Sequence, residues 1–362
     1  MHWSYRIARI RGTDVKIHVT FFLLIAFYAY EGYASGGPVA AAEITLLVLT
    51  LFACVLLHEF GHITMARRFG VRTPDVILLP IGGVARLERI PEDPKQELLI
   101  ALAGPVVNVV IAGLIQGGLI LFRVPAHSVT LNLDGLGFWE SIRNLNLWLV
   151  VFNMIPAFPM DGGRVLRALL ARNMGLMRAT RAAAGVGQLL AVAGGLAGVF
   201  VLNSPWLMLI ALFVYFGAGA ELGAVETRAI GRGLTVEQMM VTQFNSIPIH
   251  ATLQRATEML LEGEQREFPV VDNLGRVEGI LTRESLIKGL SHLGTGATVG
   301  QTMVTPVPII PAGLGFEPAY QRLRDSGLPA LPVADGAGKL IGLLTLDNIA
   351  DLLLVRRAVQ RR

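Results

Sequence analysis

Long apolar runs constrain the fold of this chain more than any other feature of its sequence. A helix that spans the hydrocarbon core of a bilayer needs about 20 mostly apolar residues. The segments of this kind are Ile17–Tyr33, Ala41–Ala66, Glu97–Phe122, Trp139–Met160, Ala182–Leu202 and Pro205–Leu222. Only 16% of the residues are charged, against about 25% in soluble domains. We therefore expect a multi-span α-helical membrane domain with about six spans.

Lysine and arginine residues are distributed unevenly between the connections of these spans. The N-terminal segment and the connections after the second and fourth spans are basic, whereas the other connections carry few basic residues. Because cytoplasmic loops carry an excess of Lys and Arg, the pattern predicts a multi-pass protein of the cell membrane with its N-terminus and C-terminal region in the cytosol. The net charge of +4 is modest and does not suggest nucleic-acid binding.

The segment Pro74–Arg89 differs from the spans around it. It is apolar, rich in β-branched residues and interrupted by Gly82–Gly83, which predicts a β-hairpin rather than a helix. At a membrane face, such backbone is tolerated only where it is paired or packed on protein. We therefore expect a membrane-associated hairpin.

The composition changes near Gly223–Gly233, beyond which charged residues and short strand-like segments return. Two copies of one pattern follow at an offset of 63 residues, as from Met240 to Met303. Each copy predicts strand–helix–strand–strand–helix, and a copy of this size buries too little core to fold alone. The predicted organisation is a membrane domain over 1–223, a linker over 224–233, and a soluble α/β pair of repeats over 234–296 and 297–362, the second with a basic tail.

The second apolar run contains His58-Glu59-Phe60-Gly61-His62. Residues four apart share one face of a helix, so both imidazoles can reach one metal ion. Glu59 is displaced by about 100° around the axis and can take a proton from a water beside the metal. Ionisable groups inside an apolar run are costly and usually functional. The motif therefore predicts a zinc hydrolase that acts on an amide bond.

A catalytic zinc site needs three protein ligands and one open position. Asp161 ends the fourth span on the cytosolic side, where Pro156 and Pro159 break the helix and its carboxylate can turn inward. Glu221 lies at similar depth and is the competing candidate, although we favour a charge at a helix end for it. The same structural explanation is open for Asp161 on these grounds alone.

Three linked motifs resemble the site-2 protease family of intramembrane zinc metalloproteases. They are HEFGH, AGPVVN at Ala103–Asn108, and N-x-x-P-x-x-P-x-D-G at Asn153–Gly162. The paired repeats resemble a pair of cystathionine-β-synthase (CBS) domains. Together they resemble the six-span prokaryotic branch of the family with a C-terminal CBS pair, and the resemblance covers nearly the whole chain.

The resemblance implies a specific chemistry. One zinc ion per chain would be held by His58, His62 and Asp161, and Glu59 would be the general base and later the proton donor. The substrate would be another membrane protein, cut within or near its transmembrane segment, as in regulated intramembrane proteolysis. The lipid bilayer would be the second partner.

Two asparagines, Asn108 and Asn153, and the predicted hairpin each have two possible interpretations. Asn108 and Asn153 match the family's buried asparagines, which would hold the substrate backbone or stabilise the oxyanion. They would otherwise form hydrogen bonds between helices. The hairpin would pair with an unwound substrate by strand addition, or serve as a structural plug.

CBS pairs commonly bind adenine nucleotides through the pattern G-x-x-T/S-x-x-D. The matching positions are Gly279-x-x-Thr282-x-x-Ser285 and Gly342-x-x-Thr345-x-x-Asn348. The aspartate is missing in both copies, although Glu284 and Asp347 lie one position earlier. Nucleotide binding at these positions and a purely dimerising role, giving a homodimer, are therefore both open.

A CBS-regulated channel or transporter is the alternative function, because CBS pairs also follow transport domains. Such a protein would show inverted repeats among its spans, and we find none between the first and second three. It would also have no use for Glu59 between two histidines.

Overall fold

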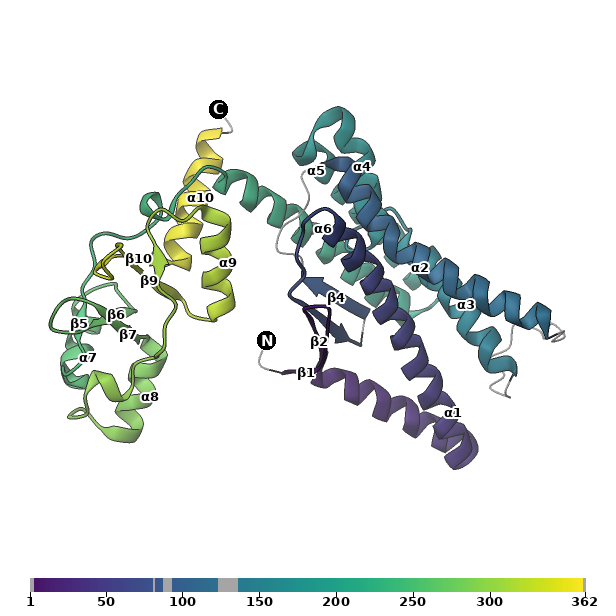
Figure 1. The fold of residues 1–362 in the computed structure, drawn as a ribbon, viewed down its shortest axis with the longest axis horizontal. Helices are drawn as coiled ribbons and strands as arrows, with labels where there is room; N and C mark the ends of the chain where they lie inside the picture. Colours follow the sequence, from purple (N-terminus) through teal and green to yellow (C-terminus); the bar gives the residue numbers. More distant parts are fainter. Residues whose placement is uncertain (1–2, 81, 87–92, 123–135, 361–362) are drawn as a thin grey trace. The chain divides into compact units, whose positions relative to one another are not determined.

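The computed structural model describes residues 3–80, 82–86, 93–122 and 136–360 and divides into two compact units, Met1–Val225 and Glu226–Arg362 (Figure 1). We describe each unit separately. The elements that begin in the first unit are β1 (Ser4–Ile10), β2 (Thr13–His18), α1 (Val19–Arg68), β3 (Asp75–Leu79), β4 (Gly82–Arg86), α2 (Pro94–Leu121), α3 (Leu136–Asn153), α4 (Asp161–Met174), α5 (Leu176–Phe200) and α6 (Pro205–Gly231).

Four helices of the described chain, α1, α2, α5 and α6, are long and apolar enough to cross a membrane by length and composition. Their large apolar side chains point outward. Leu114 is 72% exposed, Leu189 70% and Phe200 79%. Such a surface is costly in water and suits a lipid environment. The predicted fold class, an apolar helical region followed by a CBS pair, is confirmed, whereas the count of six spans is not.

Helix α1 contains two of the expected spans. Its 50 residues include non-helical backbone at Gly36 and Gly37, where the helix folds into two arms (Figure 1). The arms approach closely, because a Cβ built on Gly32 would lie 2.8 Å from the Cα of Ala41. The expected spans Ile17–Tyr33 and Ala41–Ala66 therefore fall largely on the two arms.

The expected fourth span is shorter than predicted. Helix α3 ends at Asn153, and residues 154–160 form an irregular connection that contains Pro156 and Pro159. Proline has no backbone N–H and cannot continue a helix through this stretch. The prediction that Asp161 ends the fourth span is wrong, since Asp161 is the first residue of α4.

The predicted hairpin belongs to a larger sheet with the order β1-β2-β3-β4. Strands β3 and β4 pair antiparallel, which confirms the hairpin, and β2 pairs with β3 in parallel. Strands β1 and β2 form a second hairpin that turns at Arg11 and Gly12, both with positive φ. The sequence analysis treated this N-terminal segment only as a basic tail.

The second unit holds the repeats. Its elements after α6 are η1 (Val236–Gln238), β5 (Ile247–Pro248), α7 (Leu253–Glu262), β6 (Phe268–Val271), β7 (Val277–Leu281), α8 (Arg283–Leu293), η2 (Val299–Gln301), β8 (Ile310–Pro311), α9 (Phe316–Ser326), β9 (Ala330–Ala334), β10 (Leu340–Thr345) and α10 (Leu346–Gln360). They form two three-stranded sheets, β5-β6-β7 and β10-β9-β8. The predicted strand–helix–strand–strand–helix order is present in each copy.

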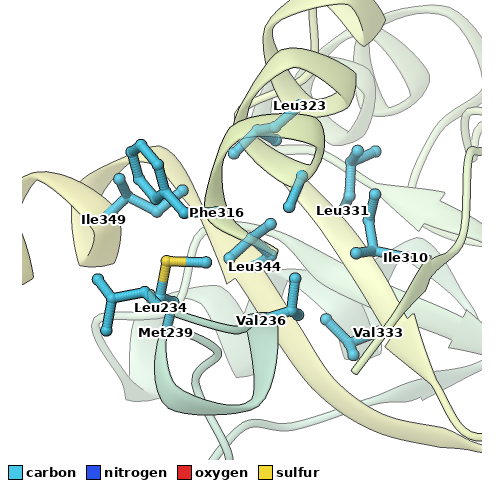
Figure 2. Close-up of a cluster of buried hydrophobic side chains, with 11 residues drawn as sticks. Leu234, Val236, Met239, Ile310, Phe316, Leu323, Leu331, Val333, Leu344 and Ile349 are labelled. Atoms are coloured by element: carbon cyan, nitrogen blue, oxygen red, sulfur yellow. The ribbon is translucent and has the colours of Figure 1, made fainter. Parts of the chain in front are cut away.

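The two repeats complete each other's hydrophobic cores. Val236 and Met239, which precede the first sheet, pack among Ile310, Leu331 and Leu344 of the second repeat (Figure 2). In the reciprocal exchange, Val299 packs in the core of the first repeat. Each repeat therefore depends on a segment that lies outside its own sheet, which explains why the copies form one domain.

Candidate metal centre

Two histidines of α1 lie one helical turn apart and face the interior of the first unit. His58 is 6% exposed and His62 is 7% exposed. Helix α2 packs directly on this turn, because a Cβ built on Gly61 would lie only 2.6 Å from the Ala103 carbonyl oxygen. Glycine at position 61 thus allows the backbones of α1 and α2 to approach.

Asp161 completes a compact triangle with the two imidazoles. The Nε2 atoms of His58 and His62 are 3.0 Å apart, and Asp161 Oδ2 lies 3.1 Å from the first and 3.2 Å from the second. Among the residues that the structure describes, these three form the one group of His, Cys, Asp and Glu side chains arranged to hold a metal ion. Asp161 is itself buried at the start of α4.

The hydrogen bonds around the imidazoles determine their tautomers. His62 Nδ1 lies 2.7 Å from the Ile100 carbonyl oxygen, which can only accept, so Nδ1 donates. His58 Nδ1 lies 2.8 Å from Asn108 Oδ1. The Asn108 amide is oriented by Asn146, which accepts from Asn108 Nδ2 at 3.1 Å and itself donates to the Ile142 carbonyl at 2.8 Å.

Both Nδ1 atoms are therefore donors, and the two Nε2 lone pairs and a carboxylate oxygen face one another. Without a cation, these three acceptors would repel each other. Three ligands of a tetrahedral zinc ion at 2.0–2.1 Å are separated by about 3.3 Å, close to the observed spacing of 3.0–3.2 Å. The residues present thus fit a zinc ion.

Gly104 of α2 forms the wall of this triangle. A Cβ at Gly104 would lie 2.3 Å from His62 Nε2 and 2.6 Å from His58 Nε2, the two atoms that face the centre. The space that a metal ion requires is therefore kept by the absence of a side chain. Gly104 belongs to the AGPVVN motif, whose sequence alone did not predict a role for this glycine.

Glu59 is half-buried beside the triangle and is not a member of it. Strand β4 passes directly over its side chain, since a Cβ built on Gly83 would lie 2.5 Å from Glu59 Cγ and 2.8 Å from its Oε1. Among the described strands, β4 pairs only with β3. The edge of the sheet thus runs beside the carboxylate that the sequence predicts as the general base.

The other predicted residues lie at different distances from this centre. Asn108 contacts His58 directly, whereas Asn153 donates from Nδ2 to the Leu149 carbonyl at 3.0 Å. Glu221 does not join the metal group, and its carboxylate forms an ion pair with Arg167. Asn146, which orients Asn108, could not be predicted from the sequence, because an amide in a helix carries no spacing signal of its own.

The predicted nucleotide positions line two cavities in the second unit. Thr345 and Asn348 line a cavity of about 840 Å³, and Thr282 and Ser285 line one of about 610 Å³. We call them the Thr345 cavity and the Thr282 cavity. Asp347 lies in the first and Glu284 in the second, so each cavity has a carboxylate one position before the expected aspartate. Both volumes suit a small-molecule ligand.

The two cavities differ in charge. The charged residues of the Thr345 cavity are Glu264, Glu267, Asp347, Asp351, Arg266 and Arg283. Those of the Thr282 cavity are Arg266, Arg283, Lys288, Glu267 and Glu284. Four acids face two bases in the first, and three bases face two acids in the second. Burial and the nearby Asp347 carboxylate raise the pKa of Glu267, as expected where acids crowd together.

The apolar helices and the buried histidine–carboxylate triangle define the class of protein as a membrane metalloprotease. The sequence matches the CBS domain over residues 236–292 and 299–355, and Peptidase family M50 over residues 46–129 and 117–194. The chain belongs to Peptidase family M50, a family of zinc metalloproteases.

The chain is similar to the following three proteins. Zinc metalloprotease MJ0392 of Methanocaldococcus jannaschii is 34% identical over 78% of this chain and 78% of its own length. Putative zinc metalloprotease Rip3 of Mycobacterium tuberculosis is 27% identical over 98% of this chain and 94% of its own. The solved Site-2 Protease from Methanocaldococcus jannaschii is 37% identical, covers 61% of this chain and 95% of its own, and has a TM-score of 0.46.

Proposed function

We propose that this chain is an intramembrane zinc endopeptidase that cuts a membrane protein within or near its transmembrane segment. His58, His62 and Asp161 would hold the zinc ion. The observation that carries the proposal is the triangle of three buried acceptor atoms, 3.0–3.2 Å apart, in a unit of outward-facing apolar helices.

The residues around the centre have separate tasks in this reaction. A zinc ion held there would supply a Lewis acid for the scissile carbonyl and for a water molecule. The Glu59 carboxylate would take a proton from the attacking water and deliver it to the leaving amide nitrogen. Asn108 and the Ile100 carbonyl hold the two imidazoles with their Nε2 lone pairs toward the centre.

Strand β4 is the proposed docking edge for the substrate. A peptide bond inside a helix is shielded, so the substrate must be extended before attack. An extended segment that adds to the edge of β4 with which none of the described strands pairs would form backbone hydrogen bonds there. Because Gly83 of β4 lies against Glu59, the added segment would run beside the general base.

The reaction would take place near the cytosolic membrane face. His62 lies five residues before Arg67, which is about 7–8 Å along a helix, and α1 ends with the basic pair Arg67–Arg68. Basic residues mark the cytosolic end of a span. The N-terminus and the CBS pair would lie on this side.

Cleavage of a single-span membrane protein tests the proposal. The purified chain and a substrate with one transmembrane segment are placed together in lipid vesicles, and the product ends are identified by mass spectrometry. We expect new ends within or next to the membrane segment. Cuts confined to its soluble domains would contradict an intramembrane protease.

We also propose that the CBS pair binds an adenine nucleotide with its phosphate in the Thr282 cavity. The favouring observation is the excess of basic residues there, where Lys288 joins Arg266 and Arg283. The Thr345 cavity has an excess of acids and would repel a phosphate. A nucleotide there would modulate the protease, whereas a pair that only dimerises would bind none.

Titration of AMP against the full-length protein in detergent tests this assignment. A hydrogen bond to a charged group contributes about 1.5 kcal/mol or more, so we expect Lys288→Ala to weaken AMP binding by about tenfold. Asp351→Asn, in the other cavity, is the matched control and should leave the affinity unchanged. Absence of AMP binding by the unmodified chain, or a loss caused only by the control, would contradict the assignment.

A further inference from the structure

The first unit contains a buried ion cluster that the reaction described above does not use. Arg167 of α4 is 1% exposed, although it lies among apolar helices. Its Nε donates to Glu97 Oε1 at 2.7 Å, its Nη2 pairs with the same oxygen, and its Nη1 pairs with Glu221 Oε1 at 2.9 Å. The guanidinium also lies over the Phe158 ring, 4.9 Å from its centroid.

This cluster connects three helices. Glu97 lies in the first turn of α2, Arg167 in the middle of α4, and Glu221 in α6. A buried charge without a partner is strongly destabilising, so the three side chains favour only arrangements in which these helices stay together. The N–H groups of the guanidinium are held in one plane. They therefore fix both the distance and the direction of the Glu97 and Glu221 carboxylates relative to Arg167.

The helix turns that the cluster holds are those that shape the metal centre. Ile100, whose carbonyl orients His62, follows Glu97 by one turn of α2. Asp161 precedes Arg167 by six residues of α4, about 9 Å along the helix. The ion pair between Glu97 and Arg167 thus joins the helix that orients an imidazole to the helix that carries the carboxylate.

We propose that Arg167 is a positioning residue of the metal centre, holding Asp161 at its distance from the two histidines through Glu97 and Glu221. Arg167 is not a member of the metal group and touches none of its three residues by hydrogen bond. The inference rests on the proposed zinc site and adds the side chain that fixes its third ligand.

The affinity of the site for zinc distinguishes this role from two others. A positioning role predicts weaker binding when Arg167 is replaced by methionine, because Asp161 loses its fixed place. A purely electrostatic role predicts tighter binding, because the loss of one positive charge leaves the two nearby carboxylates less neutralised and more attractive to the cation. A merely structural role predicts lower thermal stability with unchanged zinc affinity.

The test uses the full-length protein in detergent, with zinc affinity measured by competition against a chelator. Changes in residues that orient metal ligands typically weaken binding 10- to 100-fold, and we expect about that loss for Arg167→Met. Arg167→Lys keeps the charge but not the fork, so we expect a smaller loss. Arg143→Met is the matched control. It makes the same replacement at an arginine whose hydrogen-bond partners, Gln116 and Asn144, are not members of the cluster.

A second readout reports the geometry directly. Cobalt(II) in place of zinc gives a visible absorption spectrum that depends on the number and arrangement of ligands, and Arg167→Met should change it while Arg143→Met should not. If Arg167→Met fails to fold, Arg167→Lys carries both measurements. Unchanged or tighter binding with an unchanged spectrum would overturn the positioning role. A wild-type chain that binds no zinc would instead overturn the proposed function.

Discussion

Replacing Glu59 with glutamine should abolish cleavage of a membrane substrate while one zinc ion stays bound. The amide has nearly the same shape as the carboxylate but cannot take a proton from water. General-base catalysis contributes about 10²–10⁴-fold to a rate, and we expect a loss in that range. Zinc should remain, because Glu59 is not a member of the triangle formed by His58, His62 and Asp161.

Glu31→Gln is the matched control for this experiment. Glu31 is exposed on the other arm of the same helix, so its replacement removes one carboxylate of α1 without reaching the centre. Both variants are measured in vesicles with the same single-span substrate. A Glu59→Gln protein that cleaves at the wild-type rate would show that this carboxylate is not the base.

Adding one methyl group at Gly104 should weaken zinc binding at the metal site. The new Cβ would lie 2.3 Å from His62 Nε2 and 2.6 Å from His58 Nε2, so the imidazoles or α2 must move. Overpacking a tight interior costs about 1–3 kcal/mol, which corresponds to about 5- to 160-fold in zinc affinity if the strain falls on the bound state. Cleavage should fall with it.

Gly113→Ala is the control for Gly104→Ala. Gly113 lies in the same helix, and a Cβ there meets nothing within 4 Å. Because the new methyl group contacts nothing, this substitution should leave zinc binding unchanged. The helix should also tolerate it, since Ala favours a helix more than Gly. Equal zinc affinity of the Gly104→Ala and Gly113→Ala proteins, measured by chelator competition, would contradict the position assigned to the ion.

The sequence predicted the metal ligands and the general base better than the residues that hold them in position. His58 and His62 are four residues apart on one helix, so local geometry alone places them together. Asp161 is distant in sequence, and residue types left Glu221 as a competitor until the family resemblance favoured Asp161. The structure pairs Glu221 with Arg167 instead. Charged residues inside apolar runs usually pair with one another. This tendency could have predicted from the sequence that Glu221 pairs with a buried arginine.

The remaining differences between the predicted and the observed fold come from contacts between segments that are far apart in the chain. Strand β2 pairs with β3, whose residues lie about 60 positions later, so neither strand could be placed from its own neighbourhood. The turn at Arg11–Gly12 was a local signal for the first hairpin. In the repeats, the sequence predicted the strand–helix–strand–strand–helix order of each copy, but not the short helices η1 and η2 that precede it. The exchange of Val236 and Val299 between cores is a tertiary property that the offset does not encode.

The proposed activity depends on one metal ion held between α1 and the start of α4, and the zinc content of the purified full-length protein tests this most directly. We expect about one zinc per chain for the wild type and none for the His58→Ala/His62→Ala protein, with helix content unchanged by circular dichroism. A wild-type protein that carries no zinc after purification in zinc-containing buffer would contradict the account. A double variant that retains its zinc would do so equally.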